Sequence, residues 1–131
     1  MPHPVKVLTL ATILAIGLPA VAAAQGGGFT VDPSLATAGK KLFVKHGCGG
    51  CHGFGRVNAG PDLAGIESRR SSEWIHKWMK NTTAMLTTDS IAVQMLRDAK
   101  GVKMPQMKVS DADIDALIHY MAQEGAKVKK K

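Results

Sequence analysis

Apolar residues recur at helical spacing in four separate stretches of the chain, and this pattern predicts a protein built from α-helices. Each stretch follows a residue whose side chain can cap a helix N-terminus; these are Asp32, Ser71, Asp89 and Ser110. The helices that we expect cover residues 33–46, 72–80, about 90–100, and 111 onwards. The alternation typical of strands is lacking, so the sequence predicts an all-α fold.

The second and third predicted helices each have one apolar side. In the second helix this side consists of Trp74, Ile75, Trp78 and Met79. In the third helix the expected inner face consists of Ile91, Met95 and Leu96. Residues 47–65 carry seven glycines and one proline, which predicts a long loop. The polar stretch 81–90 is expected to be a connection.

The N-terminal residues have the pattern of a secretory signal peptide. Lys6 precedes an apolar run from Val7 to Leu18, and three alanines at 22–24 supply the small residues of a cleavage site. A membrane anchor is the alternative, although Pro19 interrupts the apolar stretch and makes it marginal for crossing about 30 Å of hydrocarbon. We therefore expect a signal peptide at 1–24 with cleavage near Ala24, a lead-in at 25–33, one domain at 34–124 and a basic tail at 125–131. This organisation predicts export to the periplasm or otherwise out of the cytoplasm.

Composition narrows the possible classes of protein. The 131 residues allow one domain, the formal charge is +7, and only 5% of residues are aromatic, so a protein core would be sparse. Two cysteines exclude a multi-disulfide scaffold and a four-cysteine zinc site within the chain.

The loop contains the motif Cys48-Gly49-Gly50-Cys51-His52, which is typical of covalent attachment of a c-type haem. Two thiols at this spacing reach two vinyl groups of one porphyrin, and the adjacent imidazole then lies under the iron. A disulfide, a thioredoxin-like redox pair and a metal site with His46 are the alternatives. A disulfide gives His52 no role, a redox pair needs a βαβ setting, and a metal site needs more ligands. The motif therefore favours one haem c, held by Cys48 and Cys51.

From Ala38 to Gln123 the chain resembles the small bacterial class I cytochromes c. The landmarks that carry the resemblance are Gly39 and Phe43, the haem motif, Gly60-Pro61-Asp62-Leu63, Met104-Pro105, and Leu117 with Tyr120. The resemblance implies about four short helices around the haem. It also implies that the first and last helices cross at Gly39, with Phe43 and Tyr120 packed across the crossing. The family's usual Asn-Pro is Asn81-Thr82 here, which leaves the 81–90 segment uncertain.

The iron of an electron carrier needs a second axial ligand opposite His52. Methionine raises the reduction potential, and Met104 and Met107 lie in the segment 101–109 between two predicted helices. The resemblance favours Met104, which precedes Pro105. Met107 is the runner-up and Met85 is weaker. We expect the other methionines of the mature chain to be core residues, and bis-histidine ligation is a further alternative; the residues concerned are Met79, Met95, Met121, His46, His76 and His119.

Further residues are expected to support the haem. By resemblance, the carbonyl of Pro61 accepts from His52 and Leu63 packs on the haem face. The haem propionates need cationic or N–H partners, for which the candidates are Arg69, Arg70, Trp74 and Trp78. The alternative for these four is a solvated basic cap and two core tryptophans.

The sequence thus favours an exported, soluble electron-transfer cytochrome with no enzymatic activity. The alternatives are a haem subunit bound permanently to a redox enzyme and a ligand-binding haem sensor or enzyme. Basic residues flank the haem-binding segments and would favour redox partners with acidic docking patches; they are Lys40, Lys41, Lys45, Arg56, Lys103 and Lys108. We expect no nucleic-acid partner and no stable membrane insertion after signal cleavage.

Overall fold

The computed structural model describes Met1 and residues 29–128. Residues 2–24 of the predicted signal peptide, most of the lead-in and the end of the basic tail lie outside the described residues. The described elements are α1 (Pro33–Lys45), a 3₁₀ turn η1 (Cys48–Gly50), α2 (Ile66–Arg69), α3 (Ser72–Lys80), α4 (Thr82–Thr88), α5 (Ser90–Asp98) and α6 (Asp111–Ala126). Helices and no strands make up this part of the chain, which confirms the all-α prediction.

The four predicted caps are present. Asp32 accepts hydrogen bonds from the backbone N–H groups of Ser34 and Leu35, at 2.8 and 3.2 Å, and begins α1. Ser110 and Asp113 form a reciprocal capping box at the start of α6. Ser71 caps α3 by accepting from the backbone N–H of Trp74, and Asp89 caps α5 by accepting from that of Ala92. The capping residues therefore determine where the four main helices begin.

Two short helices were not expected. The stretch 81–90 is not a plain connection, because Thr82–Thr88 forms α4 and buries Met85 with 4% exposure. Four of these residues are β-branched threonines and none caps α4 through its side chain, so the sequence carries little helix signal here. The one-turn helix α2 likewise begins after Gly65 with no side-chain cap.

Helix α5 also differs from its prediction. It ends at Asp98, and Lys100 takes the left-handed conformation (φ 51°) that usually favours glycine; Gly101 follows at φ 85°. Ile91 is 37% exposed, so the prediction that it lies on the inner face is wrong.

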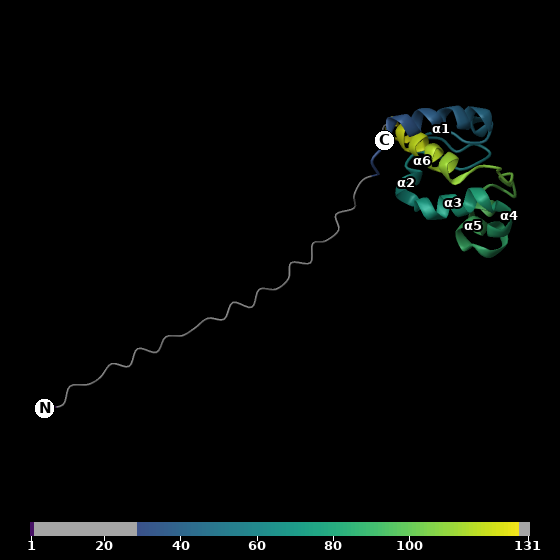
Figure 1. Ribbon diagram of the computed structural model, residues 1–131. Helices are drawn as coiled ribbons and strands as arrows, with labels where there is room; N and C mark the ends of the chain where they lie inside the picture. Colours follow the sequence, from purple (N-terminus) through teal and green to yellow (C-terminus); the bar gives the residue numbers. More distant parts are fainter. Residues whose placement is uncertain (2–28, 129–131) are drawn as a thin grey trace.

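Helices α1 and α6 pack against each other more extensively than any other pair of elements, and Figure 1 shows them side by side. A Cβ atom on Gly39 would lie 1.9 Å from the carbonyl oxygen of Ala116 and 2.8 Å from the Cβ of Tyr120. The rings of Phe43 and Tyr120 pack with centroids 5.2 Å apart. The expected crossing at Gly39 is therefore confirmed, and only glycine permits this distance between the helices.

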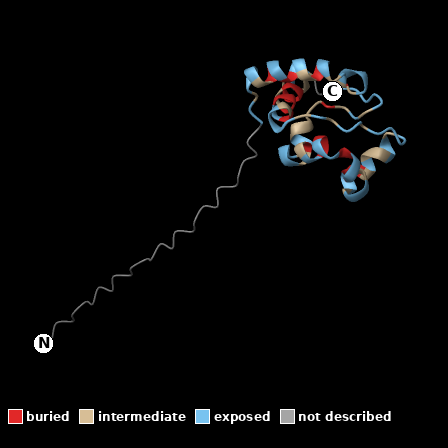
Figure 2. Ribbon diagram, turned by 45° about the vertical axis from the view of Figure 1, so that its right-hand side comes forward, coloured by how far each residue is buried: buried red, intermediate tan, exposed pale blue. Residues whose placement is uncertain are grey.

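The core follows from this crossing. Figure 2 shows the buried residues concentrated along α6 and on the inner sides of the helices around it. Ile114, Leu117 and Ile118 of α6 are at most 2% exposed, and α3 adds Ile75 and Met79. Helices α3, α4 and α5 form the other side of the molecule in Figure 1.

A polar cluster joins α3 to the first turns of α6. The two ring nitrogens of His76 lie 3.0 Å from Asp111 Oδ1 and 2.7 Å from Asp115 Oδ1, and Lys80 Nζ lies 2.9 Å from Asp111 Oδ2. Burial disfavours the charged imidazole, but hydrogen bonds to Asp111 and Asp115 outweigh it and raise the pKa of His76. Both ring nitrogens donate only in the imidazolium form, so protonation of His76 strengthens the contact between α3 and α6.

Gly39→Val should lower the free energy of unfolding of the haem-loaded protein by about 3 kcal/mol or more, the upper end of the usual cost of overpacking, because the new side chain meets backbone. Urea denaturation measures this loss. Ala38→Val on the exposed side of α1 is the matched control and should cost less than about 1 kcal/mol. Equal stability of the two variants would contradict the close crossing.

The contribution of His76 should depend on pH. Because its folded pKa is raised, its stabilisation is fully present below the unfolded pKa and is lost as pH rises through the folded pKa. Wild type should therefore exceed His76→Gln in stability at about pH 5.5, and the difference should shrink towards about pH 9. Urea denaturation of both proteins across this range tests the sign; a difference independent of pH would refute it.

Candidate functional site

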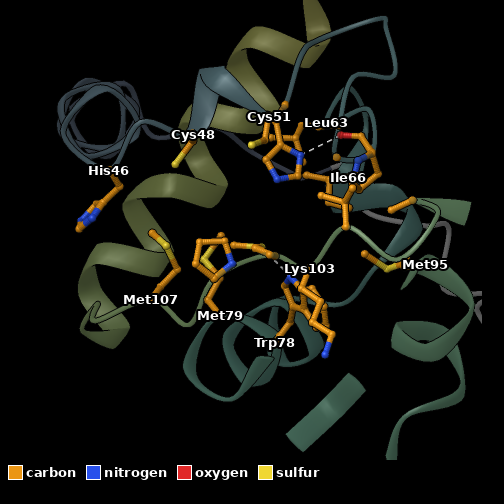
Figure 3. A pocket seen from close by; sticks show the side chains of 18 of the residues that line it. His46, Cys48, Cys51, Leu63, Ile66, Trp78, Met79, Met95, Lys103 and Met107 are labelled. Atoms are coloured by element: carbon orange, nitrogen blue, oxygen red, sulfur yellow. Dashed lines mark hydrogen bonds between the residues drawn. The ribbon is translucent and has the colours of Figure 1, made fainter. Parts of the chain in front are cut away.

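A largely apolar cavity opens between the glycine-rich loop, α3, α5 and the segment before α6. Figure 3 shows Cys48, Cys51 and Leu63 across the cavity from Trp78 and Met79. The walls include Phe43 of α1, Leu117 of α6, and Met95 with Leu96 of α5. Of the aromatic side chains, Phe43, Trp74 and Trp78 line this cavity.

The two cysteines lie at one edge of this cavity. Gly47, in the left-handed conformation (φ 65°), turns the chain out of α1 into the 3₁₀ turn that carries Cys48. Both thiols are free in the described structure; Cys48 is half-buried and Cys51 exposed. Burial raises the pKa of the Cys48 thiol and so favours its protonated form.

The imidazole of His52 is held in one orientation. Its Nδ1 lies 2.9 Å from the carbonyl oxygen of Pro61, the contact that the resemblance predicts. Because a carbonyl only accepts, Nδ1 donates this bond, and in the neutral imidazole Nε2 then keeps its lone pair. A Cβ on Gly60 would lie 2.5 Å from His52 Cε1, so the chain passes directly against the ring. His52 is therefore preset as a ligand through Nε2.

Side chains brace the loop around His52. Asp62 Oδ1 accepts from the backbone N–H groups of Gly55 and Ala64, both at 2.8 Å. The guanidinium of Arg69 donates to the carbonyls of Asp62 and Ala64, and Arg69 does not line the cavity. Leu63 is buried and lines the cavity, as its predicted place on the haem face requires. In this structure Arg69 supports the loop, and its contact with a propionate stays a prediction.

The opposite wall carries a hydrogen-bonded methionine. The indole Nε1–H of Trp78 donates to the sulfur of Met104 at 3.1 Å, and Trp78 is 8% exposed. This bond fixes the position of the sulfur and leaves it a second lone pair. Met79, Met95 and Met107 also line the cavity, and Figure 3 shows Met107 beside Met79, on the side of His46.

The two tryptophans stack. The rings of Trp74 and Trp78 are 5.6 Å apart and 10° from parallel, and Arg70 lies 5.4 Å above Trp74. The Trp74 indole donates to Asp89 at 3.3 Å. Trp74 thus lines the cavity while its N–H is engaged at the start of α5, and its predicted role as a propionate partner remains a prediction.

Several sequence-predicted ligands lie elsewhere. Met85 is buried outside the cavity lining, and His76 bridges to α6. Met121 is buried in the core, as expected. His119 accepts from the backbone N–H of Asp32 at 2.9 Å. Of the histidine alternatives, only His46 lines the cavity in the described part of the chain.

The residues present fit a covalently attached haem. Two free thiols, an imidazole with a preset Nε2 and a fixed thioether surround one apolar cavity. Within residues 29–128 there is no group of three or more His, Cys, Asp or Glu that could hold a metal ion by itself. Sequence reasoning missed the roles of Gly60 and the Trp78 indole, because a glycine or a tryptophan in the sequence does not indicate its neighbour.

Comparisons with known proteins agree with this geometry. The family model described as cytochrome c matches residues 36–124. A cytochrome c from Rhodothermus marinus is similar, with a TM-score of 0.69 and 25% identity over 96% of this chain and 92% of that one. The cytochrome c domain of a Pseudomonas putida protein has a TM-score of 0.60 and 32% identity over 68% of this chain and 89% of that one. A search of curated proteins gave no significant match.

Gly60→Ala should reduce the haem content of the matured protein, because the added Cβ displaces the His52 ring from its bond to Pro61. The measurement is haem absorbance relative to protein after purification. Asn58→Ala in the same loop adds no bulk and should keep full haem content. Full haem content and an unchanged spectrum in Gly60→Ala would show that the ring does not need this position.

Proposed function

The chain belongs to the cytochrome c family, and we propose that it is an exported monohaem carrier of single electrons whose iron is ligated by His52 and Met104. Membership establishes haem-based electron transfer and covalent haem c as the cofactor. The observation that carries the ligand assignment is the pair of preset donor atoms, His52 Nε2 and Met104 Sδ.

Both donors are fixed by a partner on the protein. Pro61 orients the imidazole and Trp78 orients the thioether, so neither side chain has to be ordered when it binds iron. Pro105 restricts the backbone next to Met104. Met107 also lines the cavity, but no hydrogen bond to its sulfur occurs in the described structure. These contacts support Met104 over Met107.

When bound, the haem supplies an iron that alternates between the ferrous and ferric states. The residues of this chain cover it and tune it. Cys48 and Cys51 would hold it through two thioether bonds, and the apolar lining, including Leu63 and Leu117, excludes water. A methionine ligand and a dry cavity both raise the potential relative to a water-exposed bis-histidine site. No substrate is turned over in this function.

Positive charge supports a partner with an acidic surface. Lys40, Lys41 and Lys45 lie exposed on α1, and Lys103 lines the cavity. Val44, among the α1 lysines, is 72% exposed, so an apolar side chain lies within this basic surface. Steering by this charge would raise the rate of encounter with an acidic redox protein.

Export rests on the sequence pattern at residues 1–24. In the described part of the chain, no helix is both long and apolar enough to cross a membrane. Permanent attachment to an enzyme and a sensor with an open coordination site are the other functions that we considered, and the fixed Met104 sulfur favours a closed site.

Met104→Ala should open the sixth coordination position. The reduced wild-type protein should keep its absorption spectrum under carbon monoxide, since both axial positions are filled, whereas the variant should bind the gas. Met107→Ala is the matched control, because it removes the other loop methionine, and should stay closed.

Each other result has a defined meaning. Carbon monoxide binding by the wild type would favour a sensor or enzyme. Binding by Met107→Ala with a closed Met104→Ala would assign the ligand to Met107. A closed site in both variants would mean either that Met104 and Met107 replace one another or that another cavity residue, such as His46, is the ligand. The double variant Met104→Ala/Met107→Ala and the single variant His46→Ala separate these explanations.

A further inference from the structure

The segment that carries Met104 has few attachments of its own. In the described structure, residues 103–109 take part in no backbone–backbone hydrogen bond. The side chains that tie this segment to the rest of the protein by hydrogen bonds are Met104, which accepts from Trp78, and Gln106. The position of the segment therefore depends on side-chain contacts with α3.

The C-terminus of α3 explains what Gln106 does. A helix leaves its last four carbonyls without intrahelical partners. The Lys77 carbonyl accepts from the N–H of Asn81 at 3.0 Å, and the Trp78 carbonyl accepts from Thr82 Oγ1 at 2.8 Å. The remaining two belong to Met79 and Lys80.

Gln106 supplies the missing donor. Its side-chain amide Nε2 lies 2.6 Å from the Lys80 carbonyl and 3.3 Å from the Met79 carbonyl. No backbone N–H reaches these two carbonyls in the described residues. Gln106 thus caps α3 from a segment 26 residues further along the chain.

We propose that Gln106 is a positioning residue that clamps the Met104 segment onto the C-terminus of α3 and so keeps the sulfur at its coordination position. The segment is attached to α3 at two points that are two residues apart. Trp78 binds the sulfur of Met104, and Gln106, which follows Pro105, binds the end of α3. The inference rests on the proposed ligation by Met104.

The helix end also determines which side chains can replace Gln106. The C-terminus of a helix carries partial negative charge and exposes acceptors only. A lysine at 106 offers N–H donors and a favourable charge, a methionine offers similar length without a donor, and a glutamate places negative charge against carbonyl oxygens. The clamp should therefore be strongest with lysine at position 106, weaker with methionine and weakest with glutamate.

The test uses the ferric haem-loaded protein and imidazole, an external ligand that binds iron only when the methionine leaves. The apparent affinity for imidazole, followed by absorption, measures how readily the segment opens. Gln106→Met should bind imidazole roughly five-fold more tightly than wild type, the effect of losing one hydrogen bond. Gln106→Glu should bind more tightly still, and Gln106→Lys should remain near wild type.

Gln94→Met is the matched control, because Gln94 is exposed on α5 and bonds only within that helix. It should leave imidazole affinity unchanged. A Gln106→Met variant equal to wild type, or a Gln106→Lys variant equal to Gln106→Met, would overturn the clamp. Urea denaturation of each variant separates a local opening from a general loss of stability.

Met104→Ala in the same titration separates the two proposals. If Met104→Ala binds imidazole no more tightly than wild type, then Met104 is not the ligand and the proposed function fails at that point. If Met104→Ala binds much more tightly while Gln106→Met and Gln106→Glu do not, only the clamp is refuted.

Discussion

The structure depends on the close approach of α1 and α6 at Gly39. Because no Cβ separates the helices there, the α1 backbone rests on the carbonyl of Ala116. This contact fixes the end of α1, from which Gly47 turns the chain into the cysteine motif. The same contact fixes α6, whose Leu117 lines the cavity. The absence of a Cβ at Gly39 thus helps to determine where the thiols of Cys48 and Cys51 lie relative to the apolar wall of the cavity.

Helix α3 positions the opposite wall of the cavity, just as the crossing of α1 and α6 positions the cysteines. It has nine residues, and different sides of the helix make different contacts. Ile75 is buried in the core, His76 joins the helix to α6, and Trp78 reaches the methionine sulfur. Its exposed carbonyl end receives Gln106. A short helix can thus position a segment that forms no backbone–backbone hydrogen bonds within the described residues, because both the side chains and the backbone of the helix bind it.

Much of this architecture was predictable from local signals. Caps at Asp32, Ser71, Asp89 and Ser110 located the main helices, and the cysteine spacing indicated the cofactor. Helix α4 was not predictable, since its threonines favour other conformations, and the contacts that stabilise it, such as burial of Met85 and the bond from Thr82 Oγ1 to the Trp78 carbonyl, are not visible in the sequence. The contacts of Trp78 and Gln106 join residues 26 apart, and no local pattern encodes such pairs.

The stacked tryptophans have an optical consequence. Trp74 and Trp78 are the only two in the chain, and both line the cavity. A haem in contact with them accepts their excitation energy, so the folded protein should emit almost no indole fluorescence. Energy transfer to a haem acts over distances comparable with the size of this protein, so the fluorescence returns only when unfolding carries the tryptophans far from the haem. The two tryptophans therefore make indole emission an intrinsic reporter of unfolding in the haem-loaded protein.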